Sequence, residues 1–523
     1  MSSIDPATMP ERQKLLIFLL MALGQFMALL DIQIVASSVA DISAGLAAAP
    51  DEASWIQTAY LMAEIVMIPF SGVLSRAFST RWLFTASAAG FTLASIGCGF
   101  ATNIETMIAM RALQGFLGGA MIPTVFATGY ALFPGPKQAI IAAILGMSGS
   151  LAPTIGPTLG GWITETYSWH WLFFINVVPG LVIASSIPFL GRVDDPNPSL
   201  LRQFDLAGLG LLAVALACFE YVLEEGFRWG WMDDPDIFHL SWIATIAGGL
   251  FVWRSLRHPS PIVDFRALKN PTFAIATLFI FVTGFGLFGA VYLLPLFLAR
   301  IAGFNALQIG GAVVSAGLAM ILSAPLIAKF SRRFDPRLLI GIGLSLFAFS
   351  LLQLTPISSK WTGIELFWPQ FIRGFSMLLC IVPATNMALG SVPPERLKMA
   401  SALFNTMRNL GGAIGIACIN TWLNSRTNLH WLRLCEHLPE GRPELGQWLV
   451  QTSGYLQQWT SDPHAADQRA IATLARILRR EAATMAFSDV LRVMSILFFG
   501  ALLFIPLLRR PASLSAAAAT EAH

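Results

Sequence analysis

Three ionisable residues, Asp31, Glu64 and Arg111, lie inside long apolar stretches of the sequence. A charge at the centre of a lipid bilayer costs about 2.5–3.5 kcal/mol on insertion scales, so such residues usually face a partner or a water-filled cavity. Asp31 and Arg111 have opposite charges and lie at similar depths in their stretches, which predicts an ion pair between two helices. Protonation of Asp31 would release Arg111, so the pair could couple proton binding to a movement. The alternative is an ion pair that only ties the two helices together.

Glu64 lies near the middle of another apolar stretch, in the run Leu61-Met-Ala-Glu64-Ile-Val. Burial favours the neutral form of a carboxyl group, so this side chain could carry a proton. The alternative is a neutral acid that is hydrogen-bonded between helices.

Five other charged residues belong to apolar stretches or end them. Arg373 and Arg408 lie within predicted spans, and Arg408 is expected to serve packing or gating in the inner half of its helix. Glu220, Glu224 and Glu225 end a stretch close to two tryptophans, which predicts a solvated cluster at the membrane interface rather than a cation site.

The composition shows which elements must position these residues. Of the 523 residues, 55% are hydrophobic and 12% are charged, against about 25% charged in ordinary soluble domains. With a mean hydropathy of +0.66, the chain has too little charge to cover a water-facing surface. The net charge is +3 and the chain has no Lys/Arg-rich run, so the sequence does not indicate a nucleic-acid-binding surface. The five cysteines are scattered without CxxC spacing, which indicates neither a metal site nor a disulfide framework. The chain is therefore predicted to be an all-α polytopic membrane protein, because helices satisfy their own backbone in lipid.

A membrane-spanning helix needs about 20 mostly apolar residues. Fourteen stretches meet this need. The first is expected to be a retained helix rather than a cleaved signal peptide, because it carries Asp31 and no cleavage site follows it directly. The stretches are 15–37, 53–74, 82–101, 105–133, 138–164, 169–190, 204–224, 240–257, 272–298, 306–329, 337–355, 365–388, 400–424 and 485–508.

The lysines and arginines of the short loops predict the orientation. If the N-terminus is cytoplasmic, nineteen of them lie on the cytoplasmic side and three, Arg228, Arg300 and Lys360, lie outside. This bias predicts that both termini are cytoplasmic.

A weak internal repeat divides the chain. The Arg-to-Pro and Pro-to-Pro intervals are 12 and 11 in the stretch that begins at Arg111, and 10 and 10 in the stretch that begins at Arg373. The simplest division of the chain that fits this repeat is two six-helix halves with two inserted helices between them. The predicted parts are 1–190 for the N-terminal half, 191–271 for the inserted helices and their linkers, 272–508 for the C-terminal half with a long extracytoplasmic loop at 425–484, and 509–523 for a cytoplasmic tail. The apolar spacing over 471–478 predicts an amphipathic helix in the long loop.

Four segments resemble signatures of the major facilitator superfamily and, within it, of the fourteen-helix drug:proton antiporters of the EmrB/QacA type. Residues 111–120 (RALQGFLGGA) resemble the family's helix-four motif, and residues 149–162 (GSLAPTIGPTLGGW) resemble the helix-five motif of antiporters. Residues 169–177 (WHWLFFINV) and 402–415 (ALFNTMRNLGGAIG) are equally typical. The resemblance covers nearly the whole chain and implies the major facilitator fold with 14 transmembrane helices.

The resemblance also implies roles for particular residues. The predicted proton-coupling set is Asp31, Glu64 and Arg111, of which the first and last lie in motifs linked to coupling. The small residues and prolines of the helix-five motif look like a hinge and seal between the halves, because small faces allow close helix approach and proline permits a bend. The predicted hinge and gating set is Pro153, Gly156, Pro157, Gly160, Gly161 and Arg408. The predicted substrate cavity is lined by Phe26, Met27, Gln33, Met62, Gln114 and Asn405.

Three positions depart from the family pattern. Gln33 and Ala36 stand where a threonine and an asparagine usually follow the aspartate of helix one. Arg76 stands in the loop after helix two where many facilitators carry aspartate, so the usual gating charge pair is not expected at that loop.

These features predict proton-driven efflux of amphipathic organic compounds across the bacterial inner membrane by alternating access. A dedicated exporter of a metabolite, fatty acid or siderophore is the alternative that the departures near Asp31 favour, and a membrane-embedded enzyme is a further one. We expect no enzyme activity, no metal site and no cofactor, because the chain has no metal-spaced cluster, no Ser-His-Asp pattern and no phosphate-binding loop. The expected partners are the substrate, protons, membrane lipid and, in a Gram-negative host, a periplasmic adaptor and an outer-membrane channel.

Overall fold

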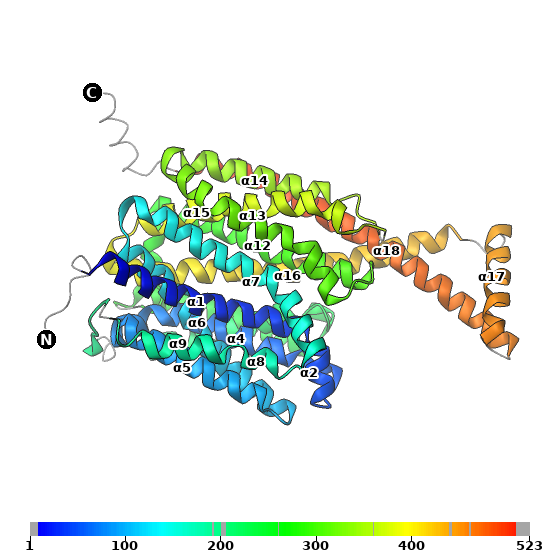
Figure 1. Cartoon of the computed structure of the whole chain (residues 1–523), viewed down its shortest axis with the longest axis horizontal. Coiled ribbons are helices and arrows are strands. Elements are labelled where there is room, and N and C mark those ends of the chain that lie inside the picture. The colour runs from blue at the N-terminus through cyan, green and yellow to red at the C-terminus, as the bar shows by residue number, and fades with distance from the viewer. Residues whose placement is uncertain are drawn as a thin grey trace.

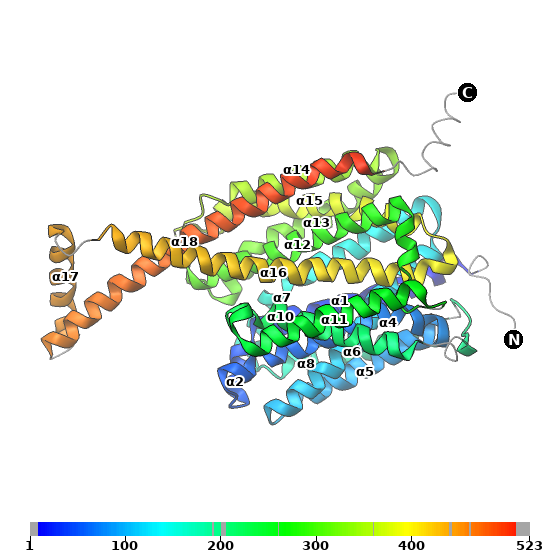
Figure 2. The same ribbon diagram turned by 180° about the vertical axis from the view of Figure 1, so that it is seen from behind.

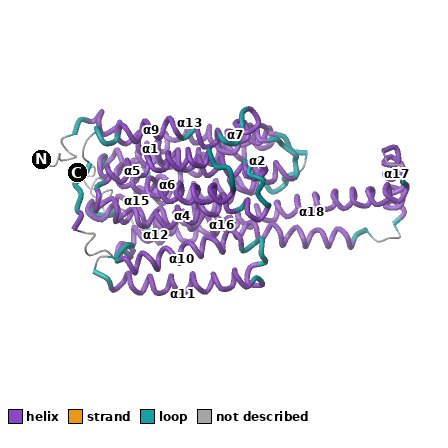
Figure 3. The backbone as a smooth tube through the Cα atoms, turned by 90° about the horizontal axis from the view of Figure 1, so that it is seen from below, coloured by secondary structure: helices purple, strands orange, loops and turns teal. Residues whose placement is uncertain are grey.

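The computed structural model describes residues 9–190, 193–199, 205–259, 261–358, 360–438, 442–459 and 462–508. These residues form helices and connecting turns, and no strand occurs among them (Figure 3). Twelve helices in the described part are long and apolar enough to cross a membrane. The predicted cytoplasmic tail, 509–523, lies outside the described residues.

The helices follow one another in the order of the predicted stretches. The first part of the chain forms α1 (Glu11–Ser37), α2 (Val39–Gly45), α3 (Pro50–Ala53), α4 (Trp55–Phe78), α5 (Thr80–Gly99), α6 (Ile104–Leu132), α7 (Gln138–Thr166), α8 (Trp171–Phe174) and α9 (Val177–Ser186). The middle part forms α10 (Leu206–Glu225) and α11 (Pro235–Arg257). The last part forms α12 (Pro271–Arg300), α13 (Ala306–Arg333), α14 (Pro336–Gln353), α15 (Gly363–Gly390), α16 (Leu397–Glu436), α17 (Pro443–Leu456), α18 (Pro463–Ala501) and the short 3-10 helix η8 (Leu502–Leu507).

All fourteen predicted stretches fall on helices, although α16 and α18 extend well beyond the predicted stretches 400–424 and 485–508. Two of them differ from a simple span. The stretch 169–190 is divided between the short helices α8 and α9, and the stretch 400–424 is the first part of the 40-residue helix α16, which carries many polar residues. For these reasons twelve helices, rather than fourteen, have the length and composition of a span.

The long helices form two groups that lie side by side (Figure 1). In the first group α4, α5 and α6 pack on one another with α1 and α9, and in the second α12, α14, α15, α16 and α18 do so. Helix α7 packs against both α1 and α13, and α16 packs against α4 and α6, so these helices form the boundary between the groups. Helices α10 and α11 pack against each other at the back of the bundle, where α10 contacts α4 and α16 (Figure 2).

A helical hairpin projects from one end of the bundle (Figures 1 and 3). It comprises residues 425–484, that is, the end of α16, the short helix α17 and the beginning of α18. The expected long loop is thus mostly helical in its described part, because α16 and α18 continue past the bundle without a break. The predicted amphipathic helix over 471–478 lies within α18. We call this end of the bundle the hairpin end, and the opposite end, where α1 begins and α18 finishes, the terminal end (Figure 1).

Candidate functional site

The predicted ion pair between Asp31 and Arg111 is present. Arg111 Nη1 on α6 donates to Asp31 Oδ2 on α1 at 2.6 Å, and both side chains are fully buried. A hydrogen bond between two charged groups at this distance is strong. Helix α6 is positioned by Asn103, whose side chain accepts a hydrogen bond from the backbone N–H of Thr106 at 2.8 Å and satisfies one of the free donors at the start of the helix.

Two side-chain amides complete the environment of the Asp31 carboxylate. Asp31 Oδ1 accepts hydrogen bonds from Gln114 Nε2 at 3.0 Å and from Asn176 Nδ2 at 2.6 Å. Both amides also donate to Ser95 Oγ, at 3.1 and 3.0 Å, and Ser95 donates to the carbonyl of Phe173 at 2.9 Å. The carboxylate is therefore held by donors from α6 and from the junction of α8 and α9, while Ser95 connects these to α5.

Arg111 is also fixed by groups other than Asp31. Its Nε donates to the carbonyl of Ile56 at 3.0 Å, and its Nη1 donates to Gln114 Oε1 at 2.7 Å. The guanidinium lies 4.3 Å from the centre of the Tyr60 ring, which favours a cation–π interaction. Because these contacts come from α1, α4, α5, α6 and the α8–α9 junction, the pair belongs to a buried polar network inside the first helix group. We call Asp31, Ser95, Arg111, Gln114 and Asn176 the acid network.

Close contact between α4 and α6 brings this network next to Glu64. A Cβ atom on Gly115 would lie 2.2 Å from the carbonyl oxygen of Tyr60, and one on Gly119 would lie 2.7 Å from that of Glu64. Both distances are too short for any side chain larger than hydrogen, so glycine is required for these helices to approach this closely. This explains why the 111–120 motif is rich in glycine.

Glu64 is buried on α4, with 3% of its surface exposed, and its Oε1 has no hydrogen-bond partner in the described part of the chain. Its carboxyl group interacts electrostatically with Arg408 of α16 and with Arg111. Arg408 is itself 5% exposed, and its Nε and Nη2 have no hydrogen-bond partner among the described residues. The Arg408 guanidinium lies 5.8 Å from the centre of the Phe126 ring on α6. Glu64 and Arg408 are therefore oppositely charged side chains, one in each helix group, and each has polar atoms without a hydrogen-bond partner among the described residues.

The helix-five motif packs α7 against its own group. A Cβ on Gly156 would lie 2.3 Å from Gln33 Cβ, and one on Gly160 would lie 2.7 Å from the carbonyl of Ile34, so both glycines face α1. Pro153 and Pro157 lie inside the continuous helix α7, and Gly161 is buried on it. On α13, a Cβ on Gly310 would lie 1.7 Å from Thr158 Oγ1 of α7. The small residues thus let α7 lie closely between α1 and α13.

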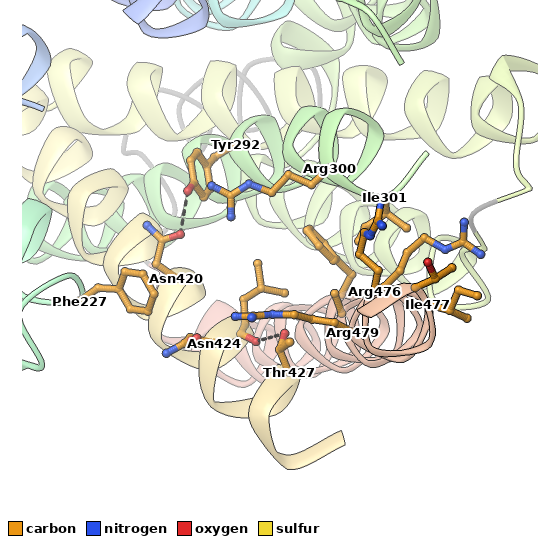
Figure 4. A pocket seen from close by; sticks show the side chains of 15 residues that line it. Phe227, Tyr292, Arg300, Ile301, Asn420, Asn424, Thr427, Arg476, Ile477 and Arg479 are labelled. Carbon is orange, nitrogen blue, oxygen red and sulfur yellow. Dashed lines mark hydrogen bonds between the residues drawn. The ribbon is translucent and has the colours of Figure 1, made fainter. Parts of the chain in front are cut away.

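The residues expected to line a substrate cavity lie on four helices. Phe26, Gln33 and Met62 are partly buried and Met27 is buried. Gln114 belongs to the acid network, and the buried Asn405 donates from Nδ2 to the carbonyl of Ser401 at 3.0 Å. None of the six lines the cavity of about 650 Å3 that the structure has at the hairpin end, which other residues form (Figure 4).

The two helix groups are joined at the terminal end by polar contacts. Lys398 on α16 donates to the carbonyl of Ser75 at 2.9 Å and forms an ion pair with Asp194. Asp194 also accepts hydrogen bonds from the backbone N–H of Thr80, at 2.9 and 3.1 Å, which anchors it to the start of α5. We call the contacts of Asp194, Lys398 and Ser75 the terminal clasp. Nearby, Ser401 donates to the carbonyl of Pro123 at 2.7 Å across the same boundary. These contacts link the two groups at this end.

The prediction of a solvated acidic cluster is wrong for two of its three members. Glu220 and Glu225 are each only 5% exposed, because α10 packs on α4 and α16 rather than standing free in the interface. Glu225 lies 3.5 Å from Arg228, while Glu220 Oε2 has no hydrogen-bond partner in the described part of the chain.

Sequence reasoning missed four residues of these arrangements. Ser95 and Asn176 are polar residues within apolar stretches, and Asn176 also lies in the 169–177 motif; these are the signals that could have indicated them. Asp194 lies in the loop between α9 and α10, and Lys398 lies at the start of α16, so their pairing depends on packing between the groups and leaves no local pattern.

A bundle of long apolar helices in two groups, one of which contains a buried acid–base network, is typical of a secondary transporter. The model of the Major Facilitator Superfamily matches residues 21–416. The chain belongs to this superfamily, and its relatives place it among the EmrB-type exporters.

The relatives cover most of the chain. It is 36% identical to the colistin resistance protein EmrB of Acinetobacter baumannii over 94% of this chain and 95% of the relative. It is 30% identical to the multidrug export protein EmrB of Escherichia coli K12 over 85% and 89% of the two chains, and 30% identical to the fatty acid resistance protein FarB of Neisseria gonorrhoeae over 80% and 82%.

Solved structures agree in fold. The proton:xylose symporter XylE superposes with a TM-score of 0.54 at 11% identity, over 95% of this chain and 96% of that one. The human organic anion transporter MFSD10 superposes with a TM-score of 0.53 at 14% identity, over 94% and 100%. At these identities the likeness concerns the fold alone.

Proposed function

We propose that the chain is a proton-driven exporter of amphipathic organic compounds that works by alternating access in the inner membrane, with both termini cytoplasmic. Family membership supports this assignment, as do the names of the relatives, which refer to multidrug export and to colistin and fatty acid resistance. The excess of lysine and arginine in the short loops on the side of the N-terminus supports the assignment of that side to the cytoplasm. We assign the chain no enzyme activity and no cofactor, and the proton gradient supplies the energy.

The observation that carries the proposal is the burial of Glu64 on α4, which packs on α16 of the other helix group, where the buried Arg408 provides the opposite charge. An ionised Glu64 attracts Arg408 and favours the arrangement in which α4 and α16 are packed together. A proton bound to the carboxylate removes that attraction, which is strong in a medium of low dielectric constant. Proton binding therefore changes which arrangement of the two groups is stable.

Asp31 is the second proposed proton acceptor, with Arg111 as its partner. Protonation of Asp31 would leave Arg111 without its counter-charge and loosen the link between α1 and α6. Because Asp31 accepts three hydrogen bonds from charged or amide donors, its ionised form is better supported than that of Glu64. We therefore assign the first protonation to Glu64 and the control of helix position to the acid network.

We also propose that the six-helix halves 1–190 and 272–508 move against each other, with 191–271 as an inserted helix pair. Helix α7 would act as the hinge and seal through Pro153, Gly156, Pro157, Gly160 and Gly161, and Arg408 would act as a gate. The proposed substrate contacts remain Phe26, Met27, Gln33, Met62, Gln114 and Asn405.

The hairpin is the proposed docking element for a periplasmic adaptor, and through it for an outer-membrane channel, in a Gram-negative host. It projects from the bundle and exposes Val450, Tyr455 and Trp459, with 73%, 62% and 75% of their surfaces free. Exposed apolar residues at such a tip are typical of a protein interface. Shortening the hairpin should spare transport in vesicles but weaken export across two membranes, and a loss in vesicles would mean that the hairpin is structural.

A dedicated exporter of one metabolite, fatty acid or siderophore is the second candidate. It is favoured by Gln33 and Ala36, which replace the usual threonine and asparagine beside Asp31.

The test is ethidium transport driven by a pH gradient in inverted membrane vesicles, with and without a protonophore, for the wild type and Asp31→Asn. We expect uptake by the wild type that collapses with the protonophore and with the substitution. Correctly inserted wild-type protein that transports no ethidium would contradict the multidrug assignment and favour the dedicated exporter. Full transport by Asp31→Asn would remove Asp31 from the mechanism.

A further inference from the structure

A cavity of about 650 Å3 lies where the hairpin joins the bundle, between the end of α12, residues 420–427 of α16 and residues 473–487 of α18 (Figure 4). Ligand pockets in proteins commonly have volumes of about 300–1,000 Å3, so the space suits a small molecule or part of a lipid. It is separate from the acid network and from Glu64, which lie on other helices.

The cavity is lined by four arginines: Arg300 at the end of α12, and Arg476, Arg479 and Arg480 on α18. Arg480 lies 3.3 Å from Glu481, but Arg300, Arg476 and Arg479 form no ion pair with any residue in the described part of the chain. In Figure 4 the side chains of Arg300 and Arg479 extend into the space between the helices. No acidic residue belongs to the lining, so the cavity carries an excess of positive charge.

Neutral polar groups lie beside the arginines. Tyr292 donates to Asn420 Oδ1 at 2.7 Å, which leaves the Asn420 amide nitrogen available as a donor, and Asn424 and Thr427 continue the same face of α16. Guanidinium and amide N–H groups on several sides of one space match the oxygens of a carboxylate or a phosphate.

Apart from Thr473, the rest of the lining is apolar. Phe227, Ile301, Leu423, Ile477 and Phe487 line the cavity together with the arginines. A small hydrophilic anion would leave these side chains unused, whereas a molecule with an acidic head and a hydrocarbon tail would contact both kinds of surface. Arginine is well suited to such a place, since its stem packs on apolar groups while its head stays polar.

We propose that this cavity binds an anionic amphiphile, whose carboxylate or phosphate is held by Arg300, Arg476 and Arg479 and whose tail lies on the apolar residues. The two sources of this chemistry are a free fatty-acid-like molecule and the head of an anionic phospholipid. The site does not depend on the proposed proton coupling, because it contains none of the residues assigned to it.

The test uses the full-length protein in a neutral detergent. Dissociation constants for oleate and for dioleoylphosphatidylglycerol are measured by native mass spectrometry, with oleyl alcohol and dioleoylphosphatidylcholine as probes that lack the net charge. The test variant is the double substitution Arg476→Gln and Arg479→Gln. The matched control is Arg433→Gln with Arg442→Gln, two exposed hairpin arginines outside the cavity.

We expect the test variant to bind the anionic probe about tenfold or more weakly than the wild type, because two charge-assisted contacts are lost, while the control binds as the wild type does. Binding of oleate that depends on the cavity arginines identifies a free amphiphile, and such binding of phosphatidylglycerol alone identifies a lipid head. Absence of binding by both probes, equal binding by the two variants, or equal affinity for oleyl alcohol and oleate would overturn the proposal. Thermal unfolding midpoints that match the wild type establish that both variants are folded.

Discussion

Asp31→Asn leaves the guanidinium of Arg111 buried in the first helix group without the carboxylate that lies 2.6 Å away. Removing one partner of a buried ion pair destabilises a protein by about 3–5 kcal/mol, because the remaining charge is unpaired. Arg111 keeps its hydrogen bonds to Ile56 and Gln114, and asparagine preserves the shape of the site, so we expect a loss near the lower end, about 3 kcal/mol. Arg111→Met should give a similar loss by leaving Asp31 ionised and unpaired.

The double variant removes both charges together. Replacing a buried ion pair by neutral residues of similar volume is often close to neutral in stability, so the combined loss should be smaller than that of either single variant. The coupling energy from this cycle should then exceed about 3 kcal/mol, which is above the usual range for residues in direct contact.

The assay is reversible unfolding of the purified protein in mixed detergent micelles, followed by tryptophan fluorescence. The matched control is the same cycle on Glu11 and Lys137, which are also 2.6 Å apart but 64% and 53% exposed. Solvent screens that pair, so its coupling energy should be near zero. Additive losses at Asp31 and Arg111 would refute the conclusion that the acid network holds α1 and α6 through paired charges.

Three further predictions concern other contacts. Gly156→Leu should abolish transport, because even a Cβ at this position would lie 2.3 Å from Gln33 Cβ. The control is Gly249→Leu, since no atom lies within 4 Å of a Cβ at that position, and normal vesicle transport by Gly156→Leu would contradict the prediction. Lys398→Gln should weaken the terminal clasp by about 1 kcal/mol, an approximately fivefold shift toward the open terminal end. The shift is measured as faster maleimide labelling of Ser401→Cys in a chain without native cysteines. Arg396→Gln, an exposed neighbour, should leave the labelling rate unchanged, and equal rates in both variants would exclude the clasp as a closing contact. Burial raises the pKa of Asp205, but hydrogen bonds from Gly208 and Arg254 outweigh burial and hold that pKa below its usual range, so its stabilising contribution is present at neutral pH and is lost as the pH falls through the lowered pKa. Asp205→Asn should therefore destabilise the α10–α11 pair at pH 7 more than at pH 3, and a loss that does not change with pH would contradict this.

Part of this structure could be predicted from the sequence because lipid imposes strict rules. Apolar stretches of sufficient length must form helices, and charges within them must find partners, so the spans and the Asp31–Arg111 pair followed directly. Glu64 was identified for the same reason, although its nearness to Arg408 depends on how α4 and α16 pack.

Other features depend on contacts between distant segments and have no local pattern. The terminal clasp brings Asp194 to Lys398, 204 residues further along the chain. Gly156 and Gly160 carry a small-residue spacing that predicts close packing without saying that the neighbour is α1. The hairpin was expected to be a loop because its many polar residues hide the continuity of α16 and α18, and the arginine-lined cavity exists only where these helices meet α12.

Glu64 is proposed to couple proton movement to export, and the most direct measurement of this role compares two modes of transport in proteoliposomes. The first mode is ethidium accumulation driven by a pH gradient, and the second is ethidium efflux down its own gradient at equal pH. For Glu64→Gln we predict that gradient-driven accumulation is lost while downhill efflux continues, because the neutral side chain can no longer exchange a proton. Gradient-driven accumulation by Glu64→Gln at the wild-type level would contradict the claim.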